Sequence, residues 1–460
     1  MRADAGQSIG YGHFVRTLAL ADMLGTEFYR TFVTRTPTAY QIEQMQMICD
    51  DYVVLSDNHF NEFLLMLKEG DIVVLDNYFF DPNYQQQIKG KGCKLVCVDD
   101  MHDKHYVADV VINHGLADTA LFDVEPYTKL CLGLDWALLR HPFWNPKSVI
   151  REKGHCVVAF GGVDYYDLTG KVVKLLSEKN NVRKITAVVG DAYAYMETLC
   201  LNQNVEIKKN LSAQQMAELF CEVEFAVLPS STVCLEAIAC GCPVLSGYYV
   251  DNQIEVHNNL AKHNYIIPLD DLLTPDLGHK LLSANIVPQK YVNSVDRVSC
   301  YRQLFRTFLF DVIDYRDLTE EQSYKVWQVR NNPVIRVCMT NTQPFDFESH
   351  CSFIDKLKKD VSKRYWAIFI QGVYVGSYYI VDIREGQAER GLFIAPEYFG
   401  KGYAKALEGY MDRYLQMFGI RELYAEVKID NPRSLKYHLK IGYFIVQVQK
   451  EYYILKRKIG

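Results

Sequence analysis

The stretch that decides the fold is Ile9-Gly10-Tyr11-Gly12-His13-Phe14-Val15-Arg16, close to the amino terminus. Arg2-Ala3-Asp4-Ala5 before it is extended in character, and residues 17–24 after it repeat apolar side chains at helical spacing. The two glycines therefore mark a turn from a strand into a helix. His13 falls at the helix start, where free N–H groups attract a phosphate and the helix dipole disfavours a protonated imidazole. The pattern predicts a proton acceptor beside a phosphate, although a tight turn with a capping histidine has the same residues.

Composition restricts the class of protein. With 460 residues the chain is long enough for two to four domains. A net charge of -6 without long blocks of like charge predicts no nucleic-acid partner. The thirteen cysteines follow no framework, and Cys240-Gly241-Cys242 lacks the spacing of a zinc or redox motif, so we expect reduced thiols in a cytoplasmic protein. No secretory segment and no apolar run of about 18 residues is present, which predicts no membrane span. The sequence does not indicate an oligomeric state.

A first series of β-rich runs alternates with helical patterns up to about residue 146. The runs at 71–76, 94–100 and 110–113 end in acidic or amide side chains. The carboxyl ends of parallel strands border the ligand crevice of an open sheet, so these side chains are expected near His13. Taken singly, each can instead cap a helix or bond a loop. The strand-end residues are Asp76, Asp99, Asp100 and Asn113.

A second series of the same kind begins at residue 156 and passes through the turn that contains Gly162. Its run at 224–228 leads into Pro229-Ser230-Ser231-Thr232 and a helical pattern that contains Glu236. Hydroxyls and free N–H groups at a helix start suit a diphosphate, and a carboxylate one turn later can accept from both hydroxyls of a ribose. Hydroxyl residues before a helix are also common caps.

These two series describe two facing Rossmann-like domains, and their motifs resemble the hydrolase family of the pseudaminic acid pathway. That family has the glycosyltransferase-B fold and removes UDP from UDP-2,4-diacetamido-2,4,6-trideoxy-β-L-altrose. The resemblance covers roughly residues 1–275. The blocks that carry it, in the family's order, are 2–5 with 9–16, 75–78, 98–100, 132–140, 161–164, 230–237 and 250–253.

The resemblance implies an inverting hydrolysis at the anomeric carbon that needs no metal. His13 matches the catalytic histidine that activates water. Asp76 and Tyr78 match the sugar side, and the nucleotide side includes Asn252; Trp136 stands where an aromatic residue is usual. The substrate-binding residues expected in this half are Gly10, Gly12, Asp76, Tyr78, Arg140, Gly162, Ser231, Thr232, Glu236, Asn252 and Gln253.

The start of the chain differs from related sequences. They usually have several apolar residues before Arg-Ala-Asp, which form a central strand, whereas here Met1 directly precedes Arg2. A shortened central strand leaves backbone groups of both neighbouring strands unpaired. We therefore expect the natural product to begin upstream.

Residues 276–324 lose the αβ rhythm, and 294–309 has the pattern of a closing helix. We predict an N-terminal Rossmann-like domain at 1–146, a UDP-binding Rossmann-like domain at 147–311 and a third domain at 312–460.

The third domain resembles the GNAT superfamily of N-acetyltransferases over about 322–460. The motifs are the strand at 423–427, the segment 430–444 and the turn Gly400-Lys401-Gly402 before a helix. Residues 326–331 and 347–350 narrow the resemblance to the acetyltransferase of the same pathway, which acetylates the 4-amino group of the sugar. Acetyl-CoA is the implied co-substrate. Its expected binding residues are Gly400, Gly402, Tyr403, Ala404 and Asn431.

Two positions depart from the GNAT pattern. Phe399 replaces the usual Arg or Gln that opens the pyrophosphate loop, so binding would rest on backbone N–H groups. His438 replaces the tyrosine that protonates the leaving thiolate, with Tyr437 about 100° round the helix. We predict His438 as the general acid, with a plain surface role as the alternative. Glu389 is the predicted base, and Glu426 is the alternative base.

The sequence thus predicts a bifunctional enzyme of pseudaminic acid biosynthesis with UDP-sugars and acetyl-CoA as its small-molecule partners. It would acetylate the 4-amine of UDP-4-amino-4,6-dideoxy-N-acetyl-β-L-altrosamine and then hydrolyse the product to UDP and free sugar. Two alternatives stay open: a glycosyltransferase of the same fold fused to an acetyltransferase, and a nucleotide-sugar-binding scaffold with degenerate sites.

Overall fold

The computed structural model describes residues 1–4, 11–115, 118–147, 149–199, 204–288, 290–291, 293, 295–339 and 341–459. The chain divides into two compact units, unit 1 (Met1–Tyr301) and unit 2 (Arg302–Gly460). Unit 1 has two large parallel sheets and unit 2 has one mixed sheet, which confirms the predicted α/β architecture. The predicted domain borders at 146/147 and 311/312 stay predictions, which limited proteolysis can test.

The first sheet of unit 1 is wholly parallel, and strand β1 lies inside it between β2 and β4. Its strands, in spatial order, are β3 (Asp51–Leu55), β2 (Thr31–Arg35), β1 (Arg2–Ala3), β4 (Ile72–Asp76), β5 (Lys94–Val98), β7 (Val110–Asn113) and β9 (Lys129–Leu132). Its helices are α1 (Gly12–Leu24), α2 (Ala39–Ile48), α3 (His59–Met66) and α4 (Pro82–Gly90). A small ladder joins β6 (His105–Tyr106) to β8 (Asp123–Val124), and short 3₁₀ turns are η1 (Gly25–Glu27), η2 (Thr119–Leu121), η3 (Leu134–Trp136) and η4 (His141–Phe143).

Helix α1 is fixed by apolar side chains on the face that meets the sheet. Phe14 and Leu18 are buried against Phe32 and Met45. Phe14 and Phe32 meet edge to face with ring centroids 5.1 Å apart. The helix ends at Gly25, whose φ of 60° suits a residue without Cβ. This packing places the first turn of α1 next to the carboxyl ends of β1 and β4.

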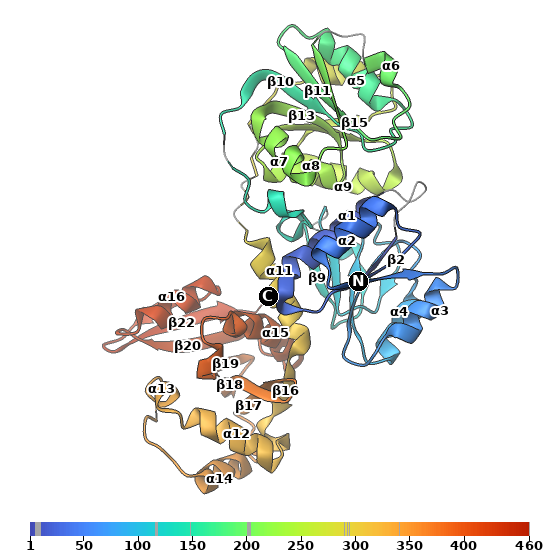
Figure 1. The fold of residues 1–460 in the computed structure, drawn as a ribbon. Coiled ribbons are helices and arrows are strands. Elements are labelled where there is room, and N and C mark those ends of the chain that lie inside the picture. Colours follow the sequence, from blue (N-terminus) through green and yellow to red (C-terminus); the bar gives the residue numbers. More distant parts are fainter. Residues whose placement is uncertain are drawn as a thin grey trace. The chain divides into compact units, whose positions relative to one another are not determined.

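The second sheet of unit 1 is also wholly parallel, and Figure 1 shows α5 and α6 on one face with α7 and α8 on the other. Its strands, in order, are β12 (Val205–Lys209), β11 (Lys184–Val189), β10 (Glu152–Val158), β13 (Val223–Pro229), β14 (Val244–Tyr248) and β15 (Ile267–Asp271). Its helices are α5 (Leu168–Ser177), α6 (Met196–Leu199), α7 (Ala213–Glu222), α8 (Thr232–Ala239), α9 (Ile254–Lys262) and α10 (Leu277–Ser283), with η5 (Asp251–Gln253) before α9.

Helix α11 (Arg297–Arg306) begins in unit 1 and ends in unit 2. At its start, the Arg297 guanidinium donates to the Leu134 carbonyl, and the Tyr301 hydroxyl donates to the Trp136 carbonyl at 2.6 Å. The closing helix predicted at 294–309 is therefore present over ten residues, followed by η6 (Thr307–Leu309).

The sheet of unit 2 is antiparallel except where β19 meets β20. Its strands, in order, are β16 (Asp311–Asp314), β17 (Arg364–Ile370), β18 (Val373–Arg384), β19 (Gln387–Ile394), β20 (Glu422–Lys428), β22 (Tyr452–Lys458) and β21 (Phe444–Val448). Its helices are α12 (Glu320–Arg330), α13 (Pro333–Arg336), α14 (Phe347–Leu357), α15 (Tyr403–Met417) and α16 (Pro432–Lys440), with short turns η7 (Tyr315–Asp317) and η8 (Pro396–Tyr398).

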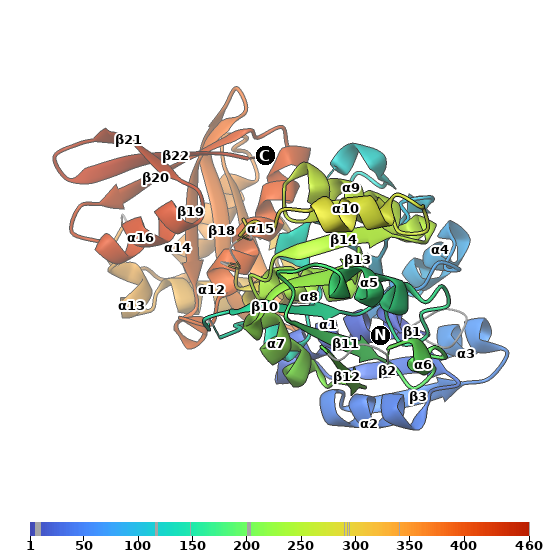
Figure 2. The ribbon, with the colours of Figure 1, turned by 90° about the horizontal axis from the view of Figure 1, so that it is seen from above.

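Two apolar clusters cover the two faces of this sheet, and Figure 2 shows its strands in orange and red. One cluster packs α12 and α14 against β17 and β18, and the other packs α15 against the strands. The parallel pairing of β19 with β20 joins only Gln387–Glu389 to Glu422–Tyr424. The ladder between the two strands ends at this pair, so Glu389 lies where they part. Every helix within the described residues is too short or too polar to cross a bilayer.

Candidate active sites

His13 is the second residue of α1 and is held by a carboxylate at the end of β4. Its Nδ1 lies 2.7 Å from Oδ1 of Asp76, and both side chains are buried. Oδ1 also accepts from Nη2 of Arg16 at 2.6 Å, and Oδ2 accepts from Nε of Arg16 and from the Thr17 hydroxyl at 2.7 and 2.8 Å. The protein therefore fills all four acceptor positions of Asp76.

These contacts define the charge of the group. Burial of Asp76 opposes its ionisation, but the charges of Arg16 and His13 and their hydrogen bonds outweigh it and hold the Asp76 pKa well below its usual value. An ionised Asp76 accepts the proton on Nδ1 of His13, which leaves Nε2 of the neutral ring as a proton acceptor. The filled acceptor positions support a role for Asp76 in orienting His13, and the predicted sugar-binding role of Asp76 stays a prediction.

Tyr78 covers the histidine from the loop after β4. The two rings meet edge to face with centroids 4.7 Å apart. The Tyr78 hydroxyl donates to Oδ2 of Asp100 at 3.2 Å and accepts from Nδ2 of Asn252 at 2.8 Å. Arg16 also binds Asp100. These contacts link His13 to Asp100, which follows β5, and to Asn252, which lies in η5. Burial is the main cause of a raised pKa of Tyr78, and the charge of Asp100 adds to it. The Tyr78 hydroxyl therefore keeps its proton at neutral pH.

Of the four strand-end residues expected beside His13, Asp76 and Asp100 lie there. Asp99 instead accepts from the backbone N–H groups of Met101 and His102 at 3.1 and 2.6 Å. Asn113 accepts from the N–H of Gly115 at 3.1 Å. These two residues have the loop-bonding role that the sequence left open.

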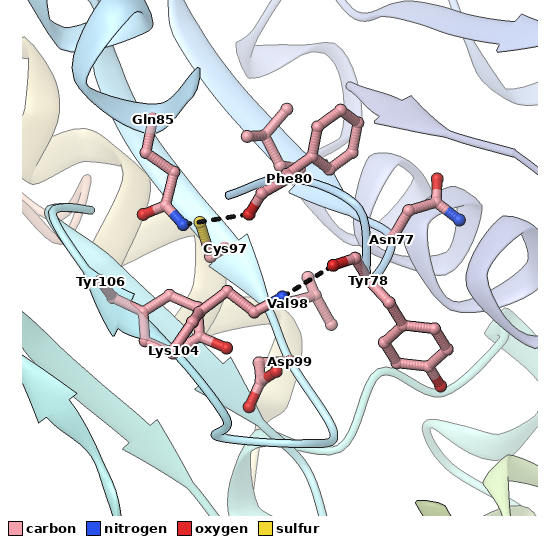
Figure 3. Close-up of a pocket in the computed structure, with 10 residues that line it drawn as sticks. Asn77, Tyr78, Phe80, Gln85, Cys97, Val98, Asp99, Lys104 and Tyr106 are labelled. Carbon is pink, nitrogen blue, oxygen red and sulfur yellow. Dashed lines mark hydrogen bonds between the residues drawn. The ribbon is translucent and has the colours of Figure 1, made fainter. Parts of the chain in front are cut away.

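Asp99 also lines a small cavity behind the Tyr78 loop (Figure 3). Lys104 donates from Nζ to the Tyr78 carbonyl at 2.7 Å, and Gln85 donates to the Phe80 carbonyl at 3.3 Å. These bonds support the loop from behind. In Figure 3 the ring of Tyr78 points away from Gln85 and Phe80.

The predicted diphosphate site at the start of α8 presents partly exposed hydroxyls. Ser231 is the N-cap, but its side chain makes no capping hydrogen bond, and Thr232 is the first residue of the helix. Ser231 therefore does not have the capping role that the sequence left as the alternative. Gly162 lies in the turn after β10, where a Cβ would meet no atom within 4 Å, and the same holds for Gly12 on α1. Gly10 lies outside the described residues.

Glu236 and Arg140 form an ion pair between residues 96 positions apart. Nε and Nη2 of Arg140 donate to the two oxygens of Glu236 at 2.7 and 2.8 Å. Each oxygen keeps a second acceptor position, so ribose binding by Glu236 stays a prediction. Gln253, the last residue of η5, accepts from the Tyr249 N–H at 3.1 Å.

In unit 2 the glycine turn precedes α15 as predicted. Gly400 and Gly402 have φ angles of 75° and 84°, which favour glycine, and Gly402 is the N-cap of the helix. Tyr403 and Ala404 begin α15, so their N–H groups lie in its first turn, where helical carbonyl partners are absent. Asn431 is the N-cap of α16, and its side chain accepts from the Ser434 N–H at 3.0 Å.

His438 lies on α16 with both ring nitrogens in hydrogen bonds. Its Nδ1 lies 2.8 Å from the Ser434 carbonyl, and its Nε2 lies 3.1 Å from Nη1 of Arg390. The carbonyl requires a proton on Nδ1, and the guanidinium requires a lone pair on Nε2. Burial, followed by the Arg390 charge, lowers the His438 pKa to about 4. These contacts work against the predicted donor role, since a neutral ring has no proton on Nε2. They also exclude a plain surface role, because His438 is buried.

The adjacent Tyr437 has the opposite character. Its hydroxyl oxygen is buried near the Arg390 guanidinium and makes no hydrogen bond of ordinary geometry among the described residues. Burial raises its pKa, so the hydroxyl holds a proton at neutral pH. Glu389, the predicted base, is partly buried, and burial, then the charges of Glu426 and Asp382, raise its pKa toward the range of a proton acceptor.

Arg330 on α12 and His350 on α14 form a further cluster. In the sequence, the segments that contain them serve only as motifs of the resemblance and have no assigned role. Among the described residues, the buried Nη1 of Arg330 has no hydrogen-bond partner, and the guanidinium lies 5.9 Å from the ring centroid of Phe345. The buried Nε2 of His350 likewise has no partner in the described part of the chain, and burial lowers the pKa of His350 to about 4. Arg330 ends α12 and His350 lies on α14. Their spacing in the sequence does not predict that the two side chains lie in one cluster.

Comparisons with known proteins agree with this division. The family model described as "Acetyltransferase (GNAT) family" matches residues 332–443. The acetyltransferase PseH of Campylobacter jejuni is 28% identical over 141 residues, which cover 30% of this chain and 88% of that protein. The UDP-2,4-diacetamido-2,4,6-trideoxy-beta-L-altropyranose hydrolase of Campylobacter jejuni is 22% identical over 273 residues, covering 57% of this chain and 96% of that protein.

A third relative extends along nearly the whole chain. The uncharacterized protein MJ1062 of Methanocaldococcus jannaschii is 23% identical over 471 residues, covering 96% of this chain and 95% of that protein. The chain therefore joins a homologue of a UDP-sugar hydrolase to a GNAT acetyltransferase domain, which confirms the two resemblances.

Proposed function

We propose that this chain is a bifunctional enzyme that carries out two consecutive steps of pseudaminic acid biosynthesis. Unit 2 transfers the acetyl group of acetyl-CoA to the 4-amino group of UDP-4-amino-4,6-dideoxy-N-acetyl-β-L-altrosamine. Unit 1 then hydrolyses UDP-2,4-diacetamido-2,4,6-trideoxy-β-L-altrose to UDP and the free sugar. The observation that carries the hydrolase half is the His13–Asp76 contact at the start of α1.

In the hydrolysis, Nε2 of His13 takes a proton from water, and the water oxygen attacks the anomeric carbon on the face opposite the diphosphate. The bond from that carbon to the phosphate oxygen breaks, UDP leaves with the electron pair, and the configuration inverts. Asp76 keeps the proton of His13 on Nδ1 and stabilises the imidazolium that forms. The N–H groups and hydroxyls at Ser231 and Thr232 bind the leaving diphosphate. Such base catalysis contributes about 10²–10⁴ in rate.

In the acetyl transfer, Glu389 receives the proton of the sugar ammonium, directly or through water. The free amine attacks the thioester carbonyl, and the C–S bond breaks as the nitrogen loses its second proton to solvent. The CoA thiolate takes up a proton. The buried hydroxyl of Tyr437, which keeps its proton at neutral pH, supports Tyr437 as the donor of that proton. The neutral ring of His438 supports a positioning role through Arg390. Backbone N–H groups at 402–404 face the pyrophosphate of acetyl-CoA.

One reaction mixture tests both halves. The full chain is incubated with the UDP-4-amino sugar and acetyl-CoA while CoA thiol and UDP are followed together. We expect thiol release first and UDP release that requires acetyl-CoA, with one UDP and one free reducing sugar per thiol. Transfer of the sugar to an added acceptor, without free reducing sugar, would instead identify a glycosyltransferase. UDP binding without turnover in either half would identify a scaffold.

A further inference from the structure

The loop that leads from β13 into α8 is anchored by a serine side chain inside the protein. Ser230 is 1% exposed, whereas Ser231 and Thr232 after it are partly exposed. Oγ of Ser230 lies 3.1 Å from Nδ1 of His257, which belongs to α9. The Ser230 N–H donates to the Gly247 carbonyl at 2.8 Å. Ser230 therefore ties the loop to the protein interior, while the next two residues reach the surface.

His257 is held in one orientation by a carboxylate on β15. Its Nε2 lies 3.1 Å from Oδ1 of Asp270, and Nζ of Lys280 donates to Oδ2 of Asp270 at 2.6 Å. The hydrogen bond from Lys280 is the main cause that lowers the pKa of Asp270, so this carboxylate is ionised at neutral pH. Burial is the main cause that lowers the pKa of His257, so its ring is neutral there. Nε2 therefore carries the proton and donates to Asp270, and Nδ1 accepts the hydroxyl proton of Ser230.

A second hydroxyl lies on the other side of Ser230. Oγ of Ser246, on β14, lies 2.9 Å from Oγ of Ser230, and it donates to the Leu228 carbonyl at 2.9 Å. Ser246 and His257 are both buried, with exposed fractions of 0% and 1%. These side chains are therefore enclosed, and a ligand at the surface of the loop does not contact them.

Helix α9 also carries the chain away from the other predicted part of the nucleotide site. It directly follows η5, which contains Asn252 and Gln253. His257 lies one helical turn after Gln253, and its bond to Ser230 joins this element to the loop before α8. A buried hydrogen bond between side chains thus connects the two segments that are predicted to bind UDP.

We propose that His257 is a positioning residue that holds the loop before α8, through Ser230, in the conformation in which Ser231 and Thr232 bind the diphosphate of UDP. The inference rests on the proposed function of unit 1, which requires UDP at these two residues. A serine hydroxyl without a fixed partner can cap the helix or turn toward the ligand. The bond to Nδ1 of His257 prevents this and keeps the inner hydroxyl away from the phosphate oxygens.

The test measures binding of UDP to the full chain by calorimetry and compares two amide replacements of the ring. The amide of Asn ends near the position of Nδ1 and can accept from Ser230, whereas the longer amide of Gln ends near Nε2 and reaches Asp270 instead. His257→Gln is expected to bind UDP about 3–10-fold more weakly than wild type, because the buried bond to Ser230 is lost. His257→Asn is expected to restore most of the affinity. His263→Gln, at the exposed end of α9, is the matched control and is expected to bind UDP as wild type does.

Two further measurements separate positioning from a general loss of structure. Uridine lacks the diphosphate, so its affinity is expected to stay close to the wild-type value in His257→Gln. Ser230→Ala removes the same hydrogen bond from the other side, so the double variant is expected to lose no more UDP affinity than the weaker-binding single variant.

An unchanged UDP affinity in His257→Gln, an equal loss for uridine, or additive losses in the double variant would each overturn the inference. Wild type that binds UDP but releases none from the UDP-sugar would refute the proposed hydrolysis, while the binding data would still decide the role of His257. Wild type that binds no UDP would overturn both.

Discussion

Nδ1 of His13 lies 2.7 Å from Oδ1 of Asp76, although the two residues are 63 positions apart in the sequence. One comes from the first turn of α1 and the other from the end of β4. The contact fixes the proton of the histidine on Nδ1 and leaves Nε2 as the proton acceptor. It leads directly to predictions that separate the two residues.

Replacing His13 by Ala removes the proposed base. We expect UDP release from the diacetamido substrate to fall at least about 100-fold, while acetyl transfer in the same chain stays at the wild-type rate. Coupled assays of UDP and of CoA thiol measure the two. His105→Ala is the matched control, since this histidine pairs with Asp123 and Glu125 on the small β6–β8 ladder. UDP release that persists in His13→Ala would exclude His13 as the base.

Replacing Asp76 by Asn distinguishes an orienting residue from a sugar-binding one. An orienting Asp76 predicts that kcat for hydrolysis falls by about 10²–10⁴ with little change in KM, because the histidine loses its defined tautomer. A sugar-binding Asp76 predicts mainly a higher KM. Steady-state kinetics decide, and thermal unfolding of the variant controls for the loss of a partner for buried Arg16.

The Arg140–Glu236 pair predicts coupled effects on stability. Either single change to Gln leaves a charged partner without its bidentate bond, and Glu236 is buried, so we expect a loss of about 1–3 kcal/mol in the free energy of unfolding. The double variant is expected to lose less than the sum of the two. Urea unfolding of the four proteins measures this coupling, and additive losses would contradict a direct pair.

Tyr437→Phe and His438→Gln separate the two neighbours on α16. Loss of the donor hydroxyl is expected to lower kcat for acetyl transfer by about 10–100-fold with KM little changed. His438→Gln keeps a hydrogen-bonding side chain beside Arg390 and is expected to retain most activity. The reverse order, an active Tyr437→Phe and an inactive His438→Gln, would restore His438 as the acid.

Unit 2 is expected to lose stability in mild acid. Burial lowers the pKa of His350 and His438 to about 4 in the folded protein, below the ordinary value of 6.5. The unfolded chain therefore binds more protons between these values, so stability is complete above pH 6.5 and falls as the pH drops toward 4. Thermal unfolding of the full chain against pH measures the loss. His438→Gln is expected to show a shallower dependence, and an identical slope would show that this histidine does not contribute.

The sequence predicted the strands and helices well because their cores are near-continuous apolar runs. The runs at 71–76 and 110–113 became β4 and β7, and the turn before α1 placed His13 at the helix start. Arg16 and Thr17 follow His13 at positions i+3 and i+4, on the same helix face, so their contact with one strand-end carboxylate could have been inferred.

Other parts of the candidate sites required coordinates. The Arg140–Glu236 pair joins the segment between η3 and η4 to helix α8, and no local pattern encodes it. The roles of Tyr437 and His438 depend on how each is placed against Arg390, whose guanidinium bonds Nε2 of His438 and lies 5.9 Å from the ring centroid of Tyr437. Asp99 and Asp100 are also neighbours whose side chains have different partners. Asp99 bonds its own loop, and Asp100 bonds Arg16.

Helix α11 limits where a gene for such a two-part protein could be divided. Its ten residues carry Tyr301, which bonds the Trp136 carbonyl, and Arg306, which bonds the Lys401 carbonyl. If evolution or an engineer separated the two activities into two open reading frames, a cut inside this helix would cost each product an anchor. A viable fission would have to duplicate the segment or supply its contacts anew.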